Sequence, residues 1–202
     1  LRGLAGGDVA GTLKITLRGG FASYFRRLLG ELPAERLELV WQSLANDAFP
    51  GSVVTSHAVE GETTIERDLL LTLTLQGGRF GRATSEGLAL PLVTDPSDIL
   101  GEFASLPARQ TPLLVDADAY RRDRVRLTIP AGWVSATPPS AVSLDTAFGS
   151  YALTVTLDND RVMIERNVSL PTRRIEPSDY QDFREFAQAI DDAERRELPL
   201  SH

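Results

Sequence analysis

The side chains that could act as nucleophiles or general bases are few, and none lies in a motif that catalysis requires. The chain has no cysteine and only two histidines, His57 and His202. A serine–histidine–aspartate triad needs a nucleophile held in a recognisable turn, and neither histidine has that context. We interpret His57 as a strand histidine and His202 as a frayed terminal residue, and we predict that this chain is not an enzyme.

Carboxylates are the other candidates for acid–base or metal chemistry. They cluster at Glu60, Glu62 and Glu66, at Asp116, Asp118 and Asp123, and at Asp158 and Asp160. Two carboxylates hydrolyse a glycosidic bond only when they face each other across a cleft, and calcium needs more oxygen ligands than this spacing supplies. We interpret the clusters as solvated loop acids. No catalytic, cofactor-binding or metal-binding residue is predicted.

Two stretches could bind an anion by their residue types alone. The sequence GGRFG at 77–81 is rich in glycine, but it lacks the lysine and hydroxyl residue of a phosphate-binding loop and no helix follows it. We predict a tight turn at its first two glycines, leading into a strand through Phe80. A basic run next to acidic residues comprises Arg121, Arg122, Arg124 and Arg126. For this run we favour a solvated strand face over an anion site.

One charged residue breaks the pattern of its predicted strand. In the stretch 161–170, Arg166 has the parity of the inward-facing apolar set. That set comprises Val162, Ile164, Val168 and Leu170. A buried charge without a partner is costly, so Arg166 must meet a carboxylate or carbonyl oxygens, or mark a bulge. We favour a structural role over ligand binding, in which Arg166 ties this hairpin to the C-terminal helix or its connector.

A hairpin and a helix near the C-terminus must position these residues. The runs 151–157 and 161–170 alternate apolar and polar side chains, as half-buried strands do, around the turn residues 158–160. A helix is predicted from Ser178 to about Arg196, and Ser178 with Gln181 fits a capping box. Its apolar stripe comprises Tyr180, Phe183, Phe186, Ala187, Ile190 and Ala193. The stripe predicts a helix that covers an apolar sheet face.

The rest of the chain is mainly a series of short strands. Two helices are predicted near the N-terminus, at 21–29 and at 33–44, the second with Trp41 on its apolar stripe. The segment 95–106 is predicted as a capped helical turn or a loop. Strands are predicted at residues 13–17, 53–59, 67–76, 88–93, 113–115, 124–129 and 141–145.

These elements predict an α+β fold dominated by β-structure. We expect mostly antiparallel sheets, sandwich-like in arrangement, with two N-terminal helices and one C-terminal amphipathic helix. Prolines interrupt the periodicity near 105–111. We therefore expect an N-terminal β-rich lobe with two helices over residues 1–105 and a C-terminal β-sandwich lobe with a capping helix over residues 106–202.

Composition excludes some partners. The formal net charge of −7 disfavours nucleic acid, which requires a basic surface. No apolar run approaches the roughly 20 residues of a membrane helix, so membrane insertion is not expected. The sequence begins at Leu1 in mid-pattern, without a signal-peptide pattern, and we expect it to be a fragment of a longer protein.

The order of several short stretches resembles a known family. They are residues 11–26 (GTLKITLRGGFASYFR), 109–113 (RQTPL), 129–133 (IPAGW), 148–151 (FGSY), the strand that ends at Arg166, 180–186 (YQDFREF) and 190–193 (IDDA). Together they resemble the C-terminal region of bacterial transglutaminase-like proteins that carry the domain of unknown function DUF3857 before a papain-like core. That family's catalytic cysteine, histidine and aspartate lie upstream in the core, and none corresponds to a residue here.

The resemblance implies a non-catalytic, β-rich accessory or interaction domain of a periplasmic, secreted or envelope protein. Its first partner would be the transglutaminase-like core of the same polypeptide, and further partners an envelope protein or a glycan. No cofactor is implied. The alternative is a free-standing carbohydrate- or protein-binding β-sandwich of the cell envelope, for which an exposed Trp41 or Trp133 would be the ligand contact, although Trp41 is better explained as core.

Overall fold

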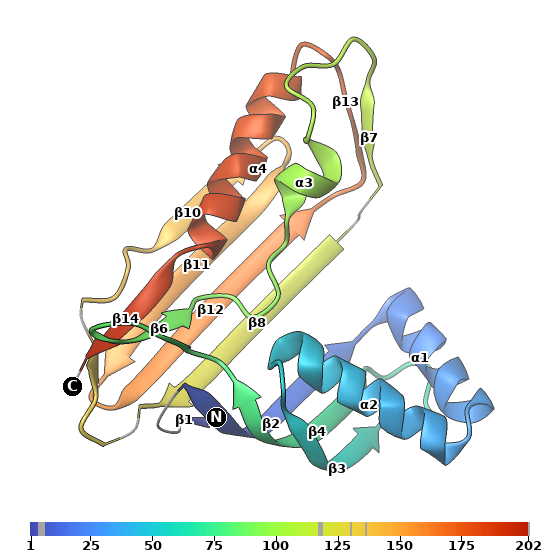
Figure 1. Cartoon of the computed structure of the whole chain (residues 1–202). Helices are drawn as coiled ribbons and strands as arrows, with labels where there is room; N and C mark the ends of the chain where they lie inside the picture. Colours follow the sequence, from blue (N-terminus) through green and yellow to red (C-terminus); the bar gives the residue numbers. More distant parts are fainter. Residues whose placement is uncertain (4–6, 117–118, 130, 136, 202) are drawn as a thin grey trace. The chain divides into compact units, whose positions relative to one another are not determined.

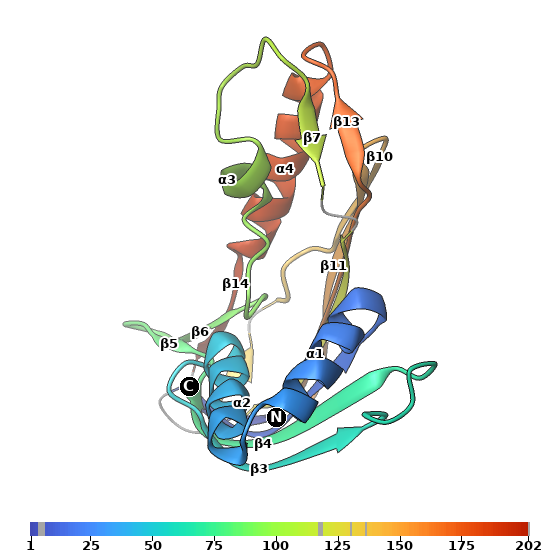
Figure 2. The same cartoon turned by 90° about the vertical axis from the view of Figure 1, so that its right-hand side faces the viewer.

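The computed structural model describes residues 1–3, 7–116, 119–129, 131–135 and 137–201. It confirms a β-dominated α+β fold with mostly antiparallel sheets (Figures 1 and 2). None of its helices, among these residues, has the length and apolarity to cross a membrane.

The chain divides into two compact units, Leu1–Arg82 and Ala83–His202. This division lies earlier than the expected one after residue 105. The segment between the two positions contains β6 (Gly87–Pro91), which pairs with β14 (Glu197–Ser201), and α3 (Ile99–Phe103), which packs on α4 (Tyr180–Glu194). Because these partners are C-terminal, the segment belongs to the second unit. The prolines near 105–111 interrupt a loop inside that unit.

The first unit is an antiparallel sheet with two helices on one face (Figure 2). The strand order is β1-β2-β4-β3. Its elements are β1 (Arg2–Gly3), β2 (Asp8–Leu17), α1 (Gly19–Glu31), α2 (Ala34–Ala48), β3 (Val53–Glu60) and β4 (Leu69–Arg79). Alternate leucines of β4 are buried, namely Leu69, Leu71, Leu73 and Leu75. Trp41 on α2 is 1% exposed, which confirms it as core.

The predicted turn at Gly77-Gly78 is wrong, because β4 continues through both glycines to Arg79. The pairing of β2 with β4 shifts register between Val9 and Gly11, so that Gln76 and Gly77 of β4 face Ala10 alone, and Gly77 in this bulge has φ of +77°. A Cβ on Gly78 would lie 2.7 Å from that of Phe49. The glycines therefore permit a bulge and a close contact within the strand.

The main sheet of the second unit has the order β10-β11-β12-β8, and each neighbouring pair is antiparallel. Its strands are β8 (Ala119–Thr128), β10 (Val142–Thr146), β11 (Gly149–Asp158) and β12 (Arg161–Leu170). The strand pair β7 (Leu113–Val115) and β13 (Arg173–Ile175) forms a second sheet. A third contains β6, β14 and β9 (Val134–Ser135), and β5 (Arg82–Ala83) straddles the division between the units.

The C-terminal hairpin and helix form as predicted, apart from the cap. The turn between β11 and β12 places Asn159 at φ of +52°, and every residue of the predicted helical stripe is buried. The helix, however, begins at Tyr180 after Asp179, with no side-chain cap. The hydroxyl of Ser178 donates to Asp179 and the amide of Gln181 to Glu185, so the predicted capping box is not formed.

Candidate functional site

The most concentrated group of charges lies inside the second unit, around Arg166 on β12. Its side chain is 1% exposed and points to the same side as the buried Ile164 and Val168. In the sheet register Arg166 stands opposite Asp123 of β8 and Leu153 of β11. The alternation of β12 therefore brings the guanidinium to the face that α4 covers (Figure 1).

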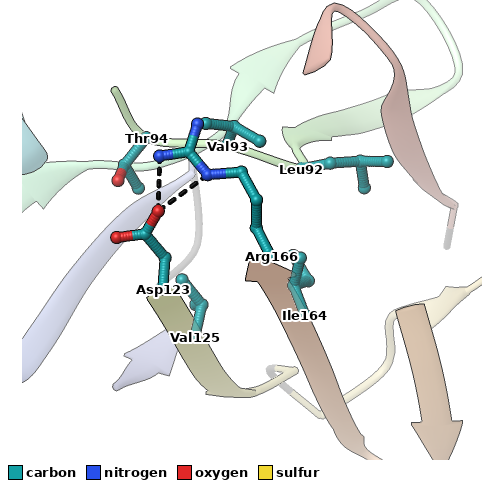
Figure 3. A pocket seen from close by; sticks show the side chains of 7 residues that line it. All are labelled: Leu92, Val93, Thr94, Asp123, Val125, Ile164 and Arg166. Carbon is teal, nitrogen blue, oxygen red and sulfur yellow. Dashed lines mark hydrogen bonds and ion pairs between the residues drawn. The ribbon is translucent and has the colours of Figure 1, made fainter. Parts of the chain in front are cut away.

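The guanidinium of Arg166 bonds to three segments of the chain. Its Nε donates to Asp123 Oδ2 at 2.7 Å, and Nη2 contacts the same oxygen (Figure 3). Its Nη1 donates to Glu194 Oε1 on α4 at 2.9 Å and to the carbonyl of Asp95 at 3.1 Å. These contacts confirm that Arg166 ties the hairpin to the C-terminal helix.

Two carboxylates of α4 hold the chain before and at the start of α3. Glu194 accepts a hydrogen bond from the Ser97 amide at 2.6 Å and from the Ser97 hydroxyl at 3.0 Å. Asp191 accepts bonds from the amides of Ile99 and Leu100 at 3.0 and 3.1 Å. The free amides of the short helix are thus capped from another helix and not by Asp98, which precedes it.

The charges continue from the interior to the surface. Arg121 Nε donates to both carboxylate oxygens of Asp123, each at 3.1 Å. Arg121 Nη1 donates to Asp95 Oδ2 at 2.6 Å. Side-chain exposure rises along this chain of ion pairs, from 1% at Arg166 and Glu194 to 33% at Asp123 and 56% at Asp95. We call these residues, with Asp191 and Ser97, the Arg166 network.

Burial changes the proton affinity of one group of the network, Asp191, and of one group beside it, Tyr151. It raises the pKa of the Asp191 carboxyl, although the amides of Leu100 and Ile99 favour the charged form. Burial, reinforced by the charge of Glu194, raises the pKa of the Tyr151 phenol, which therefore stays protonated. Both side chains are buried, so neither presents an accessible acid or base to a ligand.

The cavity next to the guanidinium is very small. Its volume is about 10 Å³, at the lower limit for a single water molecule. Its lining comprises Leu92, Val93, Thr94, Asp123, Val125, Ile164 and Arg166 (Figure 3). The network therefore leaves no room for a substrate at its buried end, and what it can do chemically is fasten strands and helices together.

A larger hollow lies at the N-terminal end of α4. This groove, which we call the α4 groove, has a volume of about 720 Å³. Its lining comprises Thr146, Ala147, Phe148, Arg173, Arg174, Ile175, Asp179, Asp182 and Glu185. The ring of Phe148 packs against Phe183 at a centroid distance of 5.6 Å, which anchors the β10–β11 turn to α4. The volume falls in the range of roughly 300–1,000 Å³ found for ligand sites.

The structure separates the residues considered as catalytic candidates. His57 lies on β3 with its ring stacked on Trp41 at 5.2 Å and 3.8 Å from the carboxylate of Glu38. His202 and Asp118 lie outside the described residues. The side chains of Glu60, Glu62, Glu66, Asp116, Asp158 and Asp160 are exposed in or beside turns. Among the described residues, no group of three or more histidines and acids could hold a metal ion.

The basic run at 121–126 is divided between the two faces of β8. Arg121 belongs to the Arg166 network, whereas Arg122, Arg124 and Arg126 are exposed on the opposite face. There Arg124 pairs with Glu165 across the strands. The alternation of the strand separates these charges, so the run does not form one anion site.

Sequence reasoning missed Asp191 and Glu194 as parts of the network. A signal was present: Asp191 and Glu194 stand four and seven residues after Ala187, on the apolar stripe of α4. Acids on an apolar stripe need buried partners, as Arg166 did on its strand. Ser97 and the Asp95 carbonyl had no such signal, because they lie in a loop.

A protein-family model matches residues 96–200, just over half of the chain and within the second unit. Its description is "Domain of Unknown Function with solved-structure structure (DUF3858)". No curated protein and no solved structure matches the chain. The matched segment includes α3, α4 and the network partners Asp123, Arg166 and Glu194. The chain therefore belongs to the DUF3858 family.

Proposed function

We propose that this chain is a non-catalytic, β-rich accessory domain of a bacterial transglutaminase-like protein of the cell envelope. It would be joined to a papain-like core, which it positions or connects to a partner. The proposal starts from the resemblance of the stretches between residues 11 and 193 to the C-terminal region of such proteins. A periplasmic or secreted location follows from the same resemblance.

The observation that best supports the proposal is the state of the Arg166 network. The side chains of Arg166 and Glu194 are 1% exposed and bond to each other, to Asp123, to Ser97 and to the Asp95 carbonyl, and Nη2 of Arg166 has only its ion-pair contact with Asp123. An active-site acid or base must reach a substrate, whereas these groups reach only each other. Such an interior is what a domain with a structural or binding role requires.

The test uses the longer gene. We expect the coding sequence on the N-terminal side of Leu1 to encode a papain-like core with a cysteine nucleophile. Limited proteolysis of the long protein should then release residues 1–202 as a stable fragment, and deletion of this fragment should change the activity of the core. A coding sequence without such a core would contradict the proposal.

The alternative is a free-standing binding module of the envelope, and the α4 groove favours a binding role. Trp133 is half-buried and Trp41 is buried, so a stacking contact with a sugar at Trp41 is not available. A titration with envelope glycans, followed by the fluorescence of Trp133, distinguishes the two proposals. Quenching of the fluorescence supports the binding module, and an unchanged spectrum supports the accessory domain.

A further inference from the structure

The outer edge of β10 meets the α4 groove at Thr146, which ends the strand and lines the groove. We propose that this surface binds an extended peptide segment of a partner polypeptide, which adds a strand to β10 and places a lysine or arginine side chain in the groove. This inference rests on the interaction role proposed above and names the chemistry of the partner. Its test needs only this chain.

The backbone of β10 offers the hydrogen bonds for an added strand. β10 stands at the end of the strand order, so one of its edges pairs with β11 and the other faces outward. Thr146 and Gly149 close a two-residue hairpin, so Thr146, Leu144 and Val142 exchange bonds with β11. Ser143 and Asp145, between them, turn their amide and carbonyl groups outward. Added strands bind such edges through the same ladder.

The edge lacks three of the features that hinder strand addition, namely proline, lysine and a bulge, and Asp145 is its one charged side chain. Residues 142–146 contain no proline and no lysine, and the β10–β11 register has no bulge. The edge strand of the first unit, β3, does contain a register shift, between Val54 and Ser56. On the face of β10 toward α4, Val142 and Leu144 are half-buried and offer apolar contact to a new neighbour.

The α4 groove supplies the charge that selects a cation. It includes Thr146, where β10 ends, and is lined by Asp179, which precedes α4, and by Asp182 and Glu185 on the first turns of α4. In the described part of the chain no ion pair engages these three carboxylates. Arg173 and Arg174 also line the groove, and Arg174 is paired with Glu176, so the lining carries three acids against two bases. Phe148 and Ile175 add apolar surface. A cation on an aliphatic stem matches this combination of apolar lining and an excess of acids over bases.

Selection from a phage-displayed library of random peptides on the whole chain tests the proposal. We expect the enriched peptides to contain alternating β-branched residues and at least one lysine or arginine. Asp182→Lys combined with Glu185→Lys should weaken their binding about tenfold or more. The matched control is Asp192→Lys, on the same helix but outside the groove, and should bind as the wild type does.

Two further measurements test the strand addition itself. Ser143→Pro removes one outward amide without affecting the bonds to β11, and it should abolish binding while the far-ultraviolet circular dichroism stays unchanged. Peptides methylated on alternate backbone nitrogens should also fail to bind, which needs no change in the protein.

Four results would overturn the inference: no enriched peptide, enriched peptides without basic residues, equal binding to the Ser143→Pro chain, or a wild-type dimer that Ser143→Pro dissociates. The last would assign the edge to a second copy of the chain. Each leaves the accessory role standing, because that role is tested on the longer protein.

Discussion

At the scale of single residues, Arg166 illustrates what strand parity can and cannot predict. Alternation along β12 required its side chain to be buried, and burial required an acidic or carbonyl partner. The structure confirms both. The identity of the partners was not accessible, because Glu194 and Asp95 are 28 and 71 residues away in the sequence. Only the packing of α4 and its neighbouring loop on the sheet brings them to the guanidinium.

Removal of Glu194 should destabilise the protein strongly. Glu194→Ala leaves the buried Arg166 short of one counter-charge and the Ser97 amide without its acceptor. We expect the free energy of unfolding to fall by about 3–5 kcal/mol, measured by denaturant titration. The control Asp192→Ala removes an exposed acid of the same helix and should change it by at most about 0.5 kcal/mol.

The same pair can be replaced as a unit. A buried ion pair often contributes little compared with apolar residues of similar volume. The double variant Arg166→Met, Glu194→Leu should therefore cost less than Glu194→Ala alone. A larger loss would show that the network contributes more to stability than apolar packing can replace.

The pH dependence of stability should contain a contribution from Asp191. Burial raises its pKa in the folded state above 3.8, so between 3.8 and the folded value the native state binds more protons than the unfolded state. This contribution is fully present below pH 3.8 and is lost as the pH rises through the folded pKa. Relative to wild type, Asp191→Asn should therefore gain stability as the pH rises through this window. Parallel stability curves for the two proteins would contradict the shift.

At the scale of elements, the buried face of α4 was predicted correctly, whereas its first residue was not. Its stripe has the helical period, and each member is buried as expected. The cap depends on which residue leaves the helical conformation, and the chain enters α4 one residue later than Ser178 implied. Ser178 and Asp179 are both residue types that precede helices, and Asp179 holds this position here although its side chain caps no amide.

Shortening a side chain of the apolar stripe should weaken the packing of α4 on the sheet. Phe186 is 5% exposed, and its ring lies 6.3 Å from that of Phe148. Phe186→Ala removes this packing and leaves a cavity, so the free energy of unfolding should fall by about 3–5 kcal/mol in a denaturant titration. A change near zero would refute a docked α4.

Because the capping box is not formed, substitution of Ser178 should have little effect on stability. A helix cap contributes roughly 0.5–2 kcal/mol, but the Ser178 hydroxyl bonds to Asp179 and not to a helix amide. We therefore expect Ser178→Ala to change the free energy of unfolding by no more than about 0.5 kcal/mol. A loss of about 1 kcal/mol or more would show that Ser178 does cap the helix.

At the scale of the whole molecule, the chain forms two units, each with its own core. Trp41 and the leucines of β4 belong to the first, and α4 with β11 and β12 to the second. The division follows Arg82 because β6 and α3 find their partners in the C-terminal segment. Composition could not show this, since the prolines near residue 107 mark a loop and not a boundary between cores.

Separate cores predict independent effects of mild core substitutions. Trp41→Phe and Phe186→Leu alter residues of different units, so their effects on the free energy of unfolding should add to within about 0.5 kcal/mol in the double variant. A coupling of more than about 1 kcal/mol in this cycle would show that the two cores interact energetically.

The sequence by itself determined the periodic features: the strands of the C-terminal hairpin, the turn at Asn159, the two N-terminal helices, the stripe of α4 and the burial of Arg166. These depend on neighbours within a few residues, where the periods of 2 and 3.6 operate. The tertiary structure alone decided the continuation of β4 through its glycines, the partners of Arg166, the capping of α3 by Asp191, and the α4 groove. Each of these requires groups distant in the chain to meet, and their meeting depends on packing, which no local pattern records.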